Sequence, residues 1–287
     1  MGWWYLILVI LGATLVWPLG RWAMRKDGNA QVLGFWISLI STLIGFTFVI
    51  LTGQHFWTWQ VLAAGTLFGI AYSVGFCVLI MYCLKIGPVG PTVTINNLAM
   101  ICGVLYGMVW LKPHIPNSLT FVGIAGTVLA LVFIGHKSSS PDSVRRINRS
   151  WLKLVLVGGA FSGFSFMAQT YVGIRYPDQS FIFVASGFAV STLILLPLVL
   201  ALPDFFHRRS ERWVGIFMGI INGFLLPLTF AALKQFSVEV VFPITVTTPM
   251  ILMLLMGHFL YREYLTKTTL AGCCLGILSV GILACSR

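Results

Sequence analysis

Charged side chains are scarce in this sequence. They make up 9% of the 287 residues, against roughly 25% in an ordinary soluble domain, while 58% of the residues are hydrophobic. This composition excludes a soluble globular protein and predicts an all-α membrane protein. A helix that crosses about 30 Å of hydrocarbon needs roughly 20 apolar residues, so ten such helices would leave no room for a separate soluble domain.

Motifs of enzymes and metal sites are also absent. The sequence contains no glycine loop of the P-loop type, no HExxH and no GxSxG, and its five histidines are scattered. The six cysteines lie inside apolar runs, without the spacing of a zinc site. We therefore expect no catalysis, no metal and no cofactor. A membrane-embedded enzyme or a sensor is the alternative class, but an enzyme needs clustered reactive groups and a sensor needs an output domain.

Negative charge is the scarcer sign, because 18 Lys and Arg stand against 7 Asp and Glu, for a net charge of +11. In a soluble protein this excess would indicate nucleic acid, but in a membrane protein it indicates basic cytoplasmic loops, so we expect no nucleic-acid partner. Apolar runs separated by polar, proline or charged breaks predict ten transmembrane helices. These cover about residues 3–20, 31–52, 59–84, 91–111, 118–136, 151–174, 179–202, 212–234, 239–260 and 266–285.

The positive charges are divided unevenly between alternate connections. The first, third, fifth, seventh and ninth connections hold 14 of the 18 Lys and Arg, and the other side holds 4. By the positive-inside rule, both termini are expected to face outward and the longest connection to be cytoplasmic. We expect a multi-pass protein of the plasma membrane, such as a bacterial inner membrane, with the lipid bilayer as its surroundings. A homodimer is also compatible with the sequence.

The two halves of the sequence resemble each other. Gly65 and Gly69 recur 150 residues later as Gly215 and Gly219. Five is an odd number of membrane crossings, so the second copy would enter the membrane inverted relative to the first, as in many secondary transporters. The predicted units are a first five-helix repeat, a basic cytoplasmic linker and a second five-helix repeat, at residues 1–136, 137–150 and 151–287.

Polar side chains inside apolar runs are the main functional signal, because each costs free energy in hydrocarbon unless it meets a partner, water or a ligand. They cluster in four predicted helices, and hydroxyls and amides without buried cations or paired carboxylates suit an uncharged polyol or sugar. Hydrogen bonds between helices are the alternative role, and packing is the alternative for Trp17, which could stack on a sugar face. The candidate substrate-binding residues are Trp17, Tyr72, Ser73, Asn96, Asn97, Gln169, Asn222, Thr245 and Thr248.

Prolines accompany these polar residues. Pro243 and Pro249 bracket the segment ITVTT. Each proline removes a backbone donor and frees a carbonyl, so we expect the turn between them to unwind and to present polar backbone to a cavity.

One acidic residue is a candidate for proton coupling. Glu239 lies in the apolar segment VEVVF, near the predicted outer end of the helix at 239–260. This setting suits a carboxylate that takes up a proton from outside. The alternative is a first-turn carboxylate favoured by the helix dipole.

Four segments carry a resemblance to a known family: the basic run after the first helix, GTLFGIAYSVG, AFSGFSFMAQ and YREYLTKTTLAG. With them the sequence resembles the drug/metabolite transporter superfamily, and within it the L-rhamnose–proton symporter family, although it is shorter. The resemblance implies ten helices in two inverted repeats, a central cavity for a sugar or other neutral metabolite, and proton coupling through a carboxylate at the place of Glu239. Many exporters of the superfamily have cytoplasmic termini, contrary to the charge count. Export of a metabolite or drug, such as an amino acid or an amphipathic compound, is the alternative function.

Overall fold

The computed structural model describes residues 2–24, 28–53, 58–86, 89–111, 117–136, 149–203, 205, 209–261 and 266–285. Within these residues the chain is helical and has no strand. The helices are α1 (Trp3–Met24), α2 (Ala30–Thr52), α3 (Trp59–Ala71), the π-helix η1 (Tyr72–Ile80), α4 (Met81–Ile86), α5 (Val89–Leu98), α6 (Met100–Tyr106), the π-helix η2 (Gly107–Leu111), α7 (Ser118–His136), α8 (Arg149–Arg175), the 3-10 helix η3 (Pro177–Gln179), α9 (Ser180–Leu200), α10 (Arg209–Leu233), α11 (Val238–Tyr261) and α12 (Lys267–Cys285).

Several of these helices continue one another, and each predicted range overlaps a helical segment. By length and composition, seven segments of the described chain could cross a membrane, and three further apolar helices are shorter. Ten crossings in two inverted repeats therefore stay a prediction. The seven are Trp3–Met24, Ala30–Thr52, Trp59–Ile86, Thr92–Leu111, Arg149–Arg175, Pro177–Leu200 and Arg209–Leu233, and the three are Ser118–Ile134, Val238–Met253 and Lys267–Leu283.

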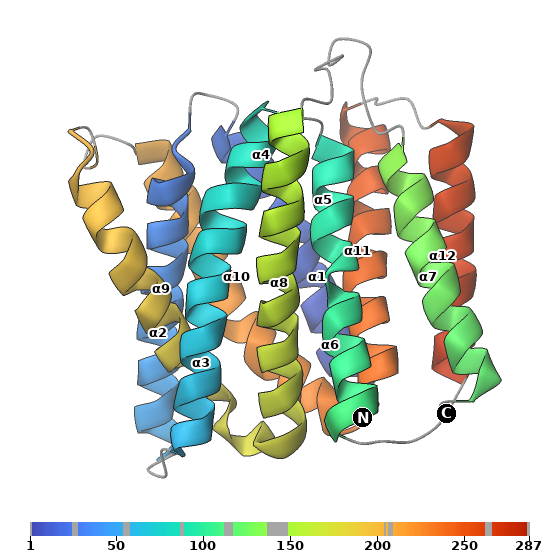
Figure 1. Cartoon of the computed structure of the whole chain (residues 1–287), viewed down its shortest axis with the longest axis horizontal. Coiled ribbons are helices and arrows are strands. Elements are labelled where there is room, and N and C mark those ends of the chain that lie inside the picture. The colour runs from blue at the N-terminus through green and yellow to red at the C-terminus, as the bar shows by residue number, and fades with distance from the viewer. Residues whose placement is uncertain are drawn as a thin grey trace.

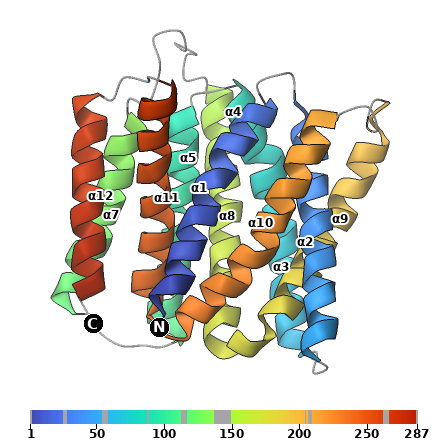
Figure 2. The same ribbon diagram turned by 180° about the vertical axis from the view of Figure 1, so that it is seen from behind.

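The helices form one upright bundle in which consecutive segments alternate in direction (Figure 1). The first residues of α1 and the last of α12 lie at the lower end of the bundle, and the end of α7 and the start of α8 lie at the upper end. Seen from behind, α1 lies between α10 and α11, and it packs on both (Figure 2). At one edge α7 packs on α12, and at the other α2 packs on α9 and α10.

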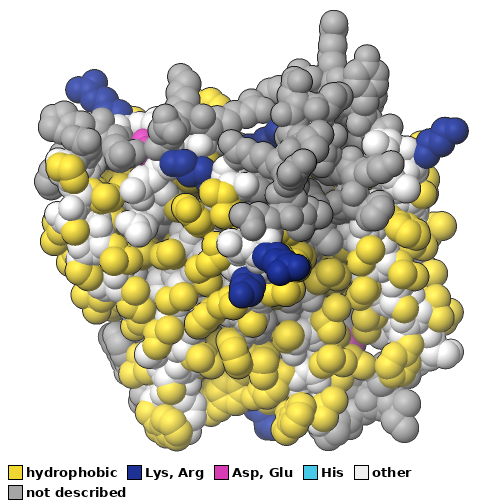
Figure 3. All heavy atoms as spheres, turned by 45° about the horizontal axis from the view of Figure 1, so that its top comes forward, with side chains coloured by type: hydrophobic (Ala, Val, Ile, Leu, Met, Phe, Trp, Pro, Cys, Tyr) yellow, Lys and Arg dark blue, Asp and Glu magenta, His cyan; other side chains and the backbone are white. Residues whose placement is uncertain are grey.

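Large apolar side chains cover the flank of the bundle. Ile50, Leu51 and Trp110 are 76%, 72% and 70% exposed. Figure 3 shows hydrophobic side chains spread over the flank. Contiguous apolar surface of this kind is unfavourable in water and suits lipid, so the chain is a multi-pass membrane protein.

Basic side chains in the described part of the chain gather near the upper end. Seven of them lie on helix ends that face it, whereas Arg175 and Lys234 lie near the end that holds the termini. Figure 3, turned so that the upper end comes forward, shows several of these side chains around it. The seven are Arg21, Lys85, Arg149, Lys153, Arg209, Arg212 and Lys267.

Glycines allow the closest helix contacts near the middle of the bundle. A Cβ atom on Gly69 of α3 would lie 2.2 Å from the carbonyl oxygen of Gly187 on α9. A Cβ atom on Gly219 of α10 would lie 2.9 Å from the carbonyl oxygen of Ile37 on α2. Both distances are too short for a real Cβ atom, so the recurring glycines bring backbones together, as small residues do in membrane helix pairs.

The expected unwinding between two prolines is wrong. The helix α11 continues through both Pro243 and Pro249. The physical reason is that each proline leaves one carbonyl without its usual helical donor, whereas an unwound turn in lipid would leave several backbone groups unpaired. Among the described residues, the π-helices η1 and η2 and the turn at Ala99 between α5 and α6 lie instead in the first half of the chain, and the 3-10 helix η3 connects α8 to α9 in the second.

Candidate functional site

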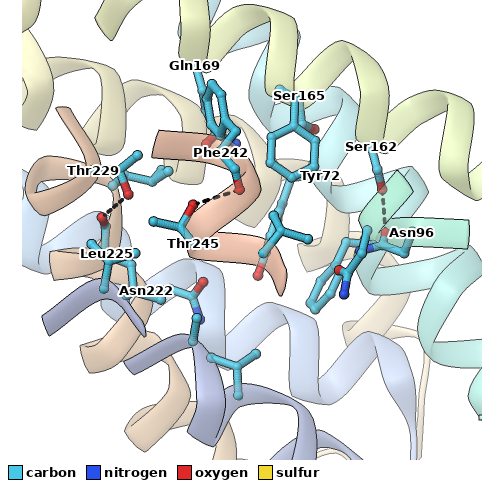
Figure 4. A pocket seen from close by; sticks show the side chains of 18 of the residues that line it. Tyr72, Asn96, Ser162, Ser165, Gln169, Asn222, Leu225, Thr229, Phe242 and Thr245 are labelled. Atoms are coloured by element: carbon cyan, nitrogen blue, oxygen red, sulfur yellow. Dashed lines mark hydrogen bonds between the residues drawn. The ribbon is translucent and has the colours of Figure 1, made fainter. Parts of the chain in front are cut away.

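A cavity of about 210 Å³ lies inside the bundle. Its walls come from α1, α3, η1 and α5 in the first half of the sequence and from α8, α9, α10 and α11 in the second. Since one water occupies about 30 Å³ of the liquid, the cavity has room for about seven waters or one small solute. Figure 4 shows the polar side chains that project into it.

Seven of the nine predicted substrate-binding residues line this one cavity, although they come from six helical segments far apart in the sequence. That they bind a substrate remains a prediction. These seven are Trp17, Tyr72, Asn96, Asn97, Gln169, Asn222 and Thr245.

The other two predicted residues do not line the cavity. Ser73 is fully buried next to Tyr72, and its hydroxyl donates to the carbonyl oxygen of Ile70 at 3.0 Å. Thr248 is half-buried, while Thr245 and Pro249 on the same helix line the cavity. Neighbouring residues of a helix point about 100° apart, so a polar residue beside a lining residue faces a different direction.

Three polar residues of the cavity were missed in the sequence analysis: Ser162, Ser165 and Thr229. A signal for them existed in the spacing. Ser162, Ser165 and Gln169 follow one another by three and four residues, which places them on one face of α8. Thr229 follows Asn222 by seven residues, two turns further along α10.

Two hydrogen bonds tie the cavity residues of α5 to helices of the second half. Ser162 Oγ on α8 donates to Asn96 Oδ1 at 2.7 Å (Figure 4), and both residues are 7% exposed. Asn97 Nδ2 lies 3.7 Å from Met250 Sδ on α11. The carboxamide of Asn96 is therefore held in a fixed orientation at the cavity wall.

On α10 and α11 the polar side chains of the cavity bond to their own helices. Thr229 Oγ1 donates to the carbonyl oxygen of Leu225 at 2.8 Å, and Thr245 Oγ1 donates to that of Val241 at 2.8 Å. The amide of Asn222 donates from Nδ2 to the carbonyl oxygen of Met218 at 2.9 Å. These bonds satisfy the donors within the helix, which lowers the cost of placing them in an apolar bundle.

A stack of aromatic rings forms another wall. Tyr72 is stacked on Phe68 and on Phe76, with ring centroids 5.5 Å and 5.2 Å apart and interplanar angles of 24° and 22°. Trp17 meets Phe76 edge-on at 5.7 Å, and all four rings line the cavity. The spacing of four residues along α3 and η1 places the three stacked rings on one side. Such a wall covers an apolar or ring-shaped part of a ligand.

The cavity is electrically neutral in the part of the chain that the structure describes, because none of its lining residues is Asp, Glu, Lys or Arg. Glu239 lies outside it, buried at 3% exposure in the first turn of α11. Phe242, three residues further along this helix, does line the cavity. Three residues rise about 4.5 Å along a helix axis, so Glu239 lies toward the end of the bundle that holds the termini.

A bundle of apolar helices around an uncharged central cavity defines a membrane protein that can hold a small solute between its two halves. Residues 149–285 match the family described as "EamA-like transporter family". This match to the second half of the chain supports a membrane transporter of the drug/metabolite transporter superfamily. It gives no support to the carbohydrate branch in particular.

The likeness to solved structures covers the whole length. A structure described only as "Crystal structure of protein" matches 98% of this chain over 97% of its own, with a TM-score of 0.75 and 15% sequence identity. At this identity the likeness shows the fold alone. None of the curated proteins matches the chain.

Proposed function

We propose that the protein is a secondary active transporter that moves a small neutral solute across the membrane by alternating access. The observation that carries this proposal is the uncharged cavity, whose polar residues come from both halves of the sequence. Its volume of about 210 Å³ lies below the roughly 300–1,000 Å³ of sites for drug-sized ligands, which favours a small metabolite. Hydroxyls, amides and aromatic rings together suit a sugar, so we place a sugar first.

We further propose that residues 1–136 and 151–287 are inverted repeats that exchange conformations. Reciprocal contacts support this, because Gly69 packs on Gly187 and Gly219 packs on Ile37. A shift of 150 residues takes Gly69 to Gly219 and takes position 37 to position 187, so each contact is the counterpart of the other. Such reciprocity is the property of a two-fold arrangement of like units.

A second reciprocal pair lies at the other edge of the bundle. A Cβ atom on Gly123 would lie 2.6 Å from Leu283, and one on Gly272 would lie 2.9 Å from Ile134. The residues of this pair are related by a shift of 149. Alternating access follows if each half can adopt the conformation of the other.

The proposed orientation places the termini outside and the connection at 137–150 in the cytoplasm of a plasma membrane. It rests on the basic side chains near the end of the bundle opposite the termini. An alkaline phosphatase fused to the C-terminus should be active in a bacterial host, and an inactive fusion would contradict this orientation.

Counterflow in proteoliposomes tests the function. Vesicles loaded with an unlabelled monosaccharide should accumulate the labelled form against its gradient, and a panel that includes L-rhamnose, D-glucose and D-xylose identifies the preferred sugar. The second candidate function is export of an amino acid or an amphipathic compound. The family match and the aromatic wall favour this function as much as they favour sugar transport. Exchange of an amino acid or an amphipathic amine, with no exchange of any sugar, would establish it instead.

Proton coupling through Glu239 is a separate prediction. We expect Glu239→Gln to lose uptake driven by a pH gradient while it retains exchange of substrate between the two sides, because an amide cannot take up the coupling proton. The measurement compares the two modes of transport in the same proteoliposomes.

The matched control is Glu211→Gln. Glu211 is also 3% exposed, and it lies in the first turn of α10 at the opposite end of the bundle. Its Oε1 accepts a hydrogen bond from the backbone N–H of Asn29 at 3.3 Å, which glutamine can still accept. Gradient-driven uptake should survive this substitution. Unchanged uptake in Glu239→Gln would remove Glu239 from the mechanism.

A further inference from the structure

Side chains of α10 and α11 present hydrogen-bond acceptors to the cavity. A threonine hydroxyl has one proton and two lone pairs, and the protons of Thr229 and Thr245 are bound by carbonyl oxygens of their own helices. Asn222 directs Nδ2 to the carbonyl oxygen of Met218, and in the described part of the chain its Oδ1 accepts no hydrogen bond. Apart from the second N–H of Asn222, these three side chains therefore offer a ligand mainly oxygen lone pairs.

The wall formed by α5 and α8 has the complementary polarity. Asn96 Oδ1 accepts a hydrogen bond from the Ser162 hydroxyl, which fixes the orientation of the amide. Within the described residues the two N–H groups of Asn96 make no hydrogen bond, so they remain as donors. Gln169 lines the same cavity from α8, and its amide makes no hydrogen bond within the residues that the structure describes. Figure 4 shows Asn222, Thr229 and Thr245 on one side and Asn96 with Ser162 on the other.

We propose that this polarity orients the substrate and selects its class. Asn222, Thr229 and Thr245 form an acceptor wall that binds hydroxyl or amine protons of the substrate, while the Asn96 amide donates to an acceptor atom at its other end. The stacked rings of Phe68, Tyr72 and Phe76 cover its apolar face. The substrate is then a neutral molecule rich in O–H donors. This inference rests on the proposed function, and it adds Thr229 as a residue that determines specificity.

Anionic groups are disfavoured by the same wall. The hydroxyl protons of Thr229 and Thr245 are held by backbone carbonyl oxygens. A carboxylate or phosphate oxygen placed beside these hydroxyls would therefore face their lone pairs. A hydroxyl donor at this place removes the mismatch. The inference thus separates sugars from sugar phosphates and from organic acids of the same size.

A cycle of two ligands and two proteins tests the acceptor wall. The ligands are the sugar that competes best in counterflow and its singly O-methylated derivatives, in which one oxygen remains and its proton is lost. In the wild-type protein, at least one derivative should bind about fivefold more weakly or worse, which is the loss of one neutral hydrogen bond. In Thr245→Val or Thr229→Val, the sugar and that derivative should bind equally, because the acceptor is gone.

Two further variants control for packing and folding. Thr245→Ser keeps the hydroxyl and should restore the preference for the free sugar. Thr47→Val is the matched control, because Thr47 on α2 also bonds to its own helix, donating to the carbonyl oxygen of Leu43 at 2.8 Å, but it is exposed and lies outside the cavity. Equal binding of the sugar and all its methyl ethers to the wild-type protein, or an undiminished preference in both valine variants, would overturn the acceptor wall.

Failure of the proposed function has a different signature. If no sugar exchanges, the assignment of a sugar is wrong, and the cycle is run with the amine that does exchange and with its quaternary N-methylated derivative. The quaternary form keeps the charge and lacks N–H donors. Weaker binding of the quaternary form to the wild-type protein, with no such difference in Thr245→Val, would support the acceptor wall while overturning the assignment of a neutral substrate. Equal binding of the two forms to the wild-type protein would overturn the acceptor wall.

Discussion

Replacing Gly69 by alanine is expected to destabilise the protein by about 3 kcal/mol or more, or to prevent its folding, although the change adds one methyl group. A Cβ atom at this position would lie 2.2 Å from the carbonyl oxygen of Gly187 and 2.9 Å from Val190 Cβ. A backbone oxygen cannot rotate away as the end of a long side chain can, so α3 and α9 must separate. Thermal unfolding of the purified protein in detergent measures the effect, and fluorescence-detected size exclusion reports the folded yield.

Gly281→Ala is the matched control for this result. Gly281 lies on α12, and apart from the adjoining residues and backbone of its own helix no atom of the described residues lies within 4 Å of the place its Cβ would take. Alanine there should be neutral, or stabilising by up to about 1 kcal/mol through its higher helix propensity. Melting of Gly69→Ala at the wild-type temperature would mean that α3 and α9 are less tightly packed than the structure has them.

The proposed repeat relation between the two halves extends this prediction. Gly219 corresponds to Gly69 after a shift of 150 residues, and a Cβ atom there would lie 2.7 Å from Ile40 Cβ and 2.9 Å from the carbonyl oxygen of Ile37. Its substitution should therefore also destabilise the protein, by a smaller amount because the distances are longer. The contact between α10 and α2 thus carries the same role as that between α3 and α9.

The helices could be predicted from the sequence because a membrane imposes one strong rule. Backbone groups in lipid must be paired within the helix, so apolar runs of sufficient length become helices almost regardless of their detailed composition. The predicted range 59–84 corresponds to the continuous segment Trp59–Ile86, and 118–136 to α7 at Ser118–His136. The same rule explains why α11 does not unwind at Pro243 and Pro249.

The positions of the cavity residues were harder to predict than the helices. The free-energy cost of a polar group in hydrocarbon marks a side chain such as Asn96 or Asn222 as a candidate. It does not indicate how the helix is rotated about its own axis. Rotation separates Tyr72, which lines the cavity, from Ser73, which does not. The π-helical geometry of η1 begins at these residues, so a period of 3.6 residues does not give their directions.

Serine and threonine give the weakest sequence signal for a cavity residue. Their hydroxyls bond to the carbonyl oxygen four residues earlier, as Thr229 does with Leu225, so they cost little in an apolar helix and carry a weak signal. The spacing of Ser162 from Ser165 and Gln169 indicates a shared face of α8, but it does not indicate the hydrogen bond that Ser162 makes. Its partner Asn96 lies 66 residues away on another helix, and no pattern within α8 reveals that contact.

Replacing Asn96 by aspartate should nearly abolish transport of a neutral solute while the protein still folds. The two side chains have the same shape, and a carboxylate still accepts the hydrogen bond that Ser162 Oγ now donates at 2.7 Å. The change removes both N–H donors and adds a negative charge to a cavity without charged lining residues in the described part of the chain. Losing two hydrogen bonds to the solute, each worth up to about 1.5 kcal/mol, and replacing them by repulsion from the carboxylate should lower initial rates of counterflow about a hundredfold.

The control for Asn96→Asp is the same substitution outside the cavity. Asn117 precedes α7, and its Oδ1 accepts a hydrogen bond from the exposed hydroxyl of Ser118 at 3.2 Å, so Asn117→Asp adds the same charge where water solvates it. Its transport should match that of the wild type, since aspartate and asparagine are equally suited to the position before a helix. If Asn96→Asp transports as well as Asn117→Asp, the Asn96 amide does not contact the solute. If Asn96→Asp fails only because it unfolds, its melting temperature will fall with its activity, and Asn96→Ser, which keeps a donor without adding charge, then decides whether the amide or the fold was lost.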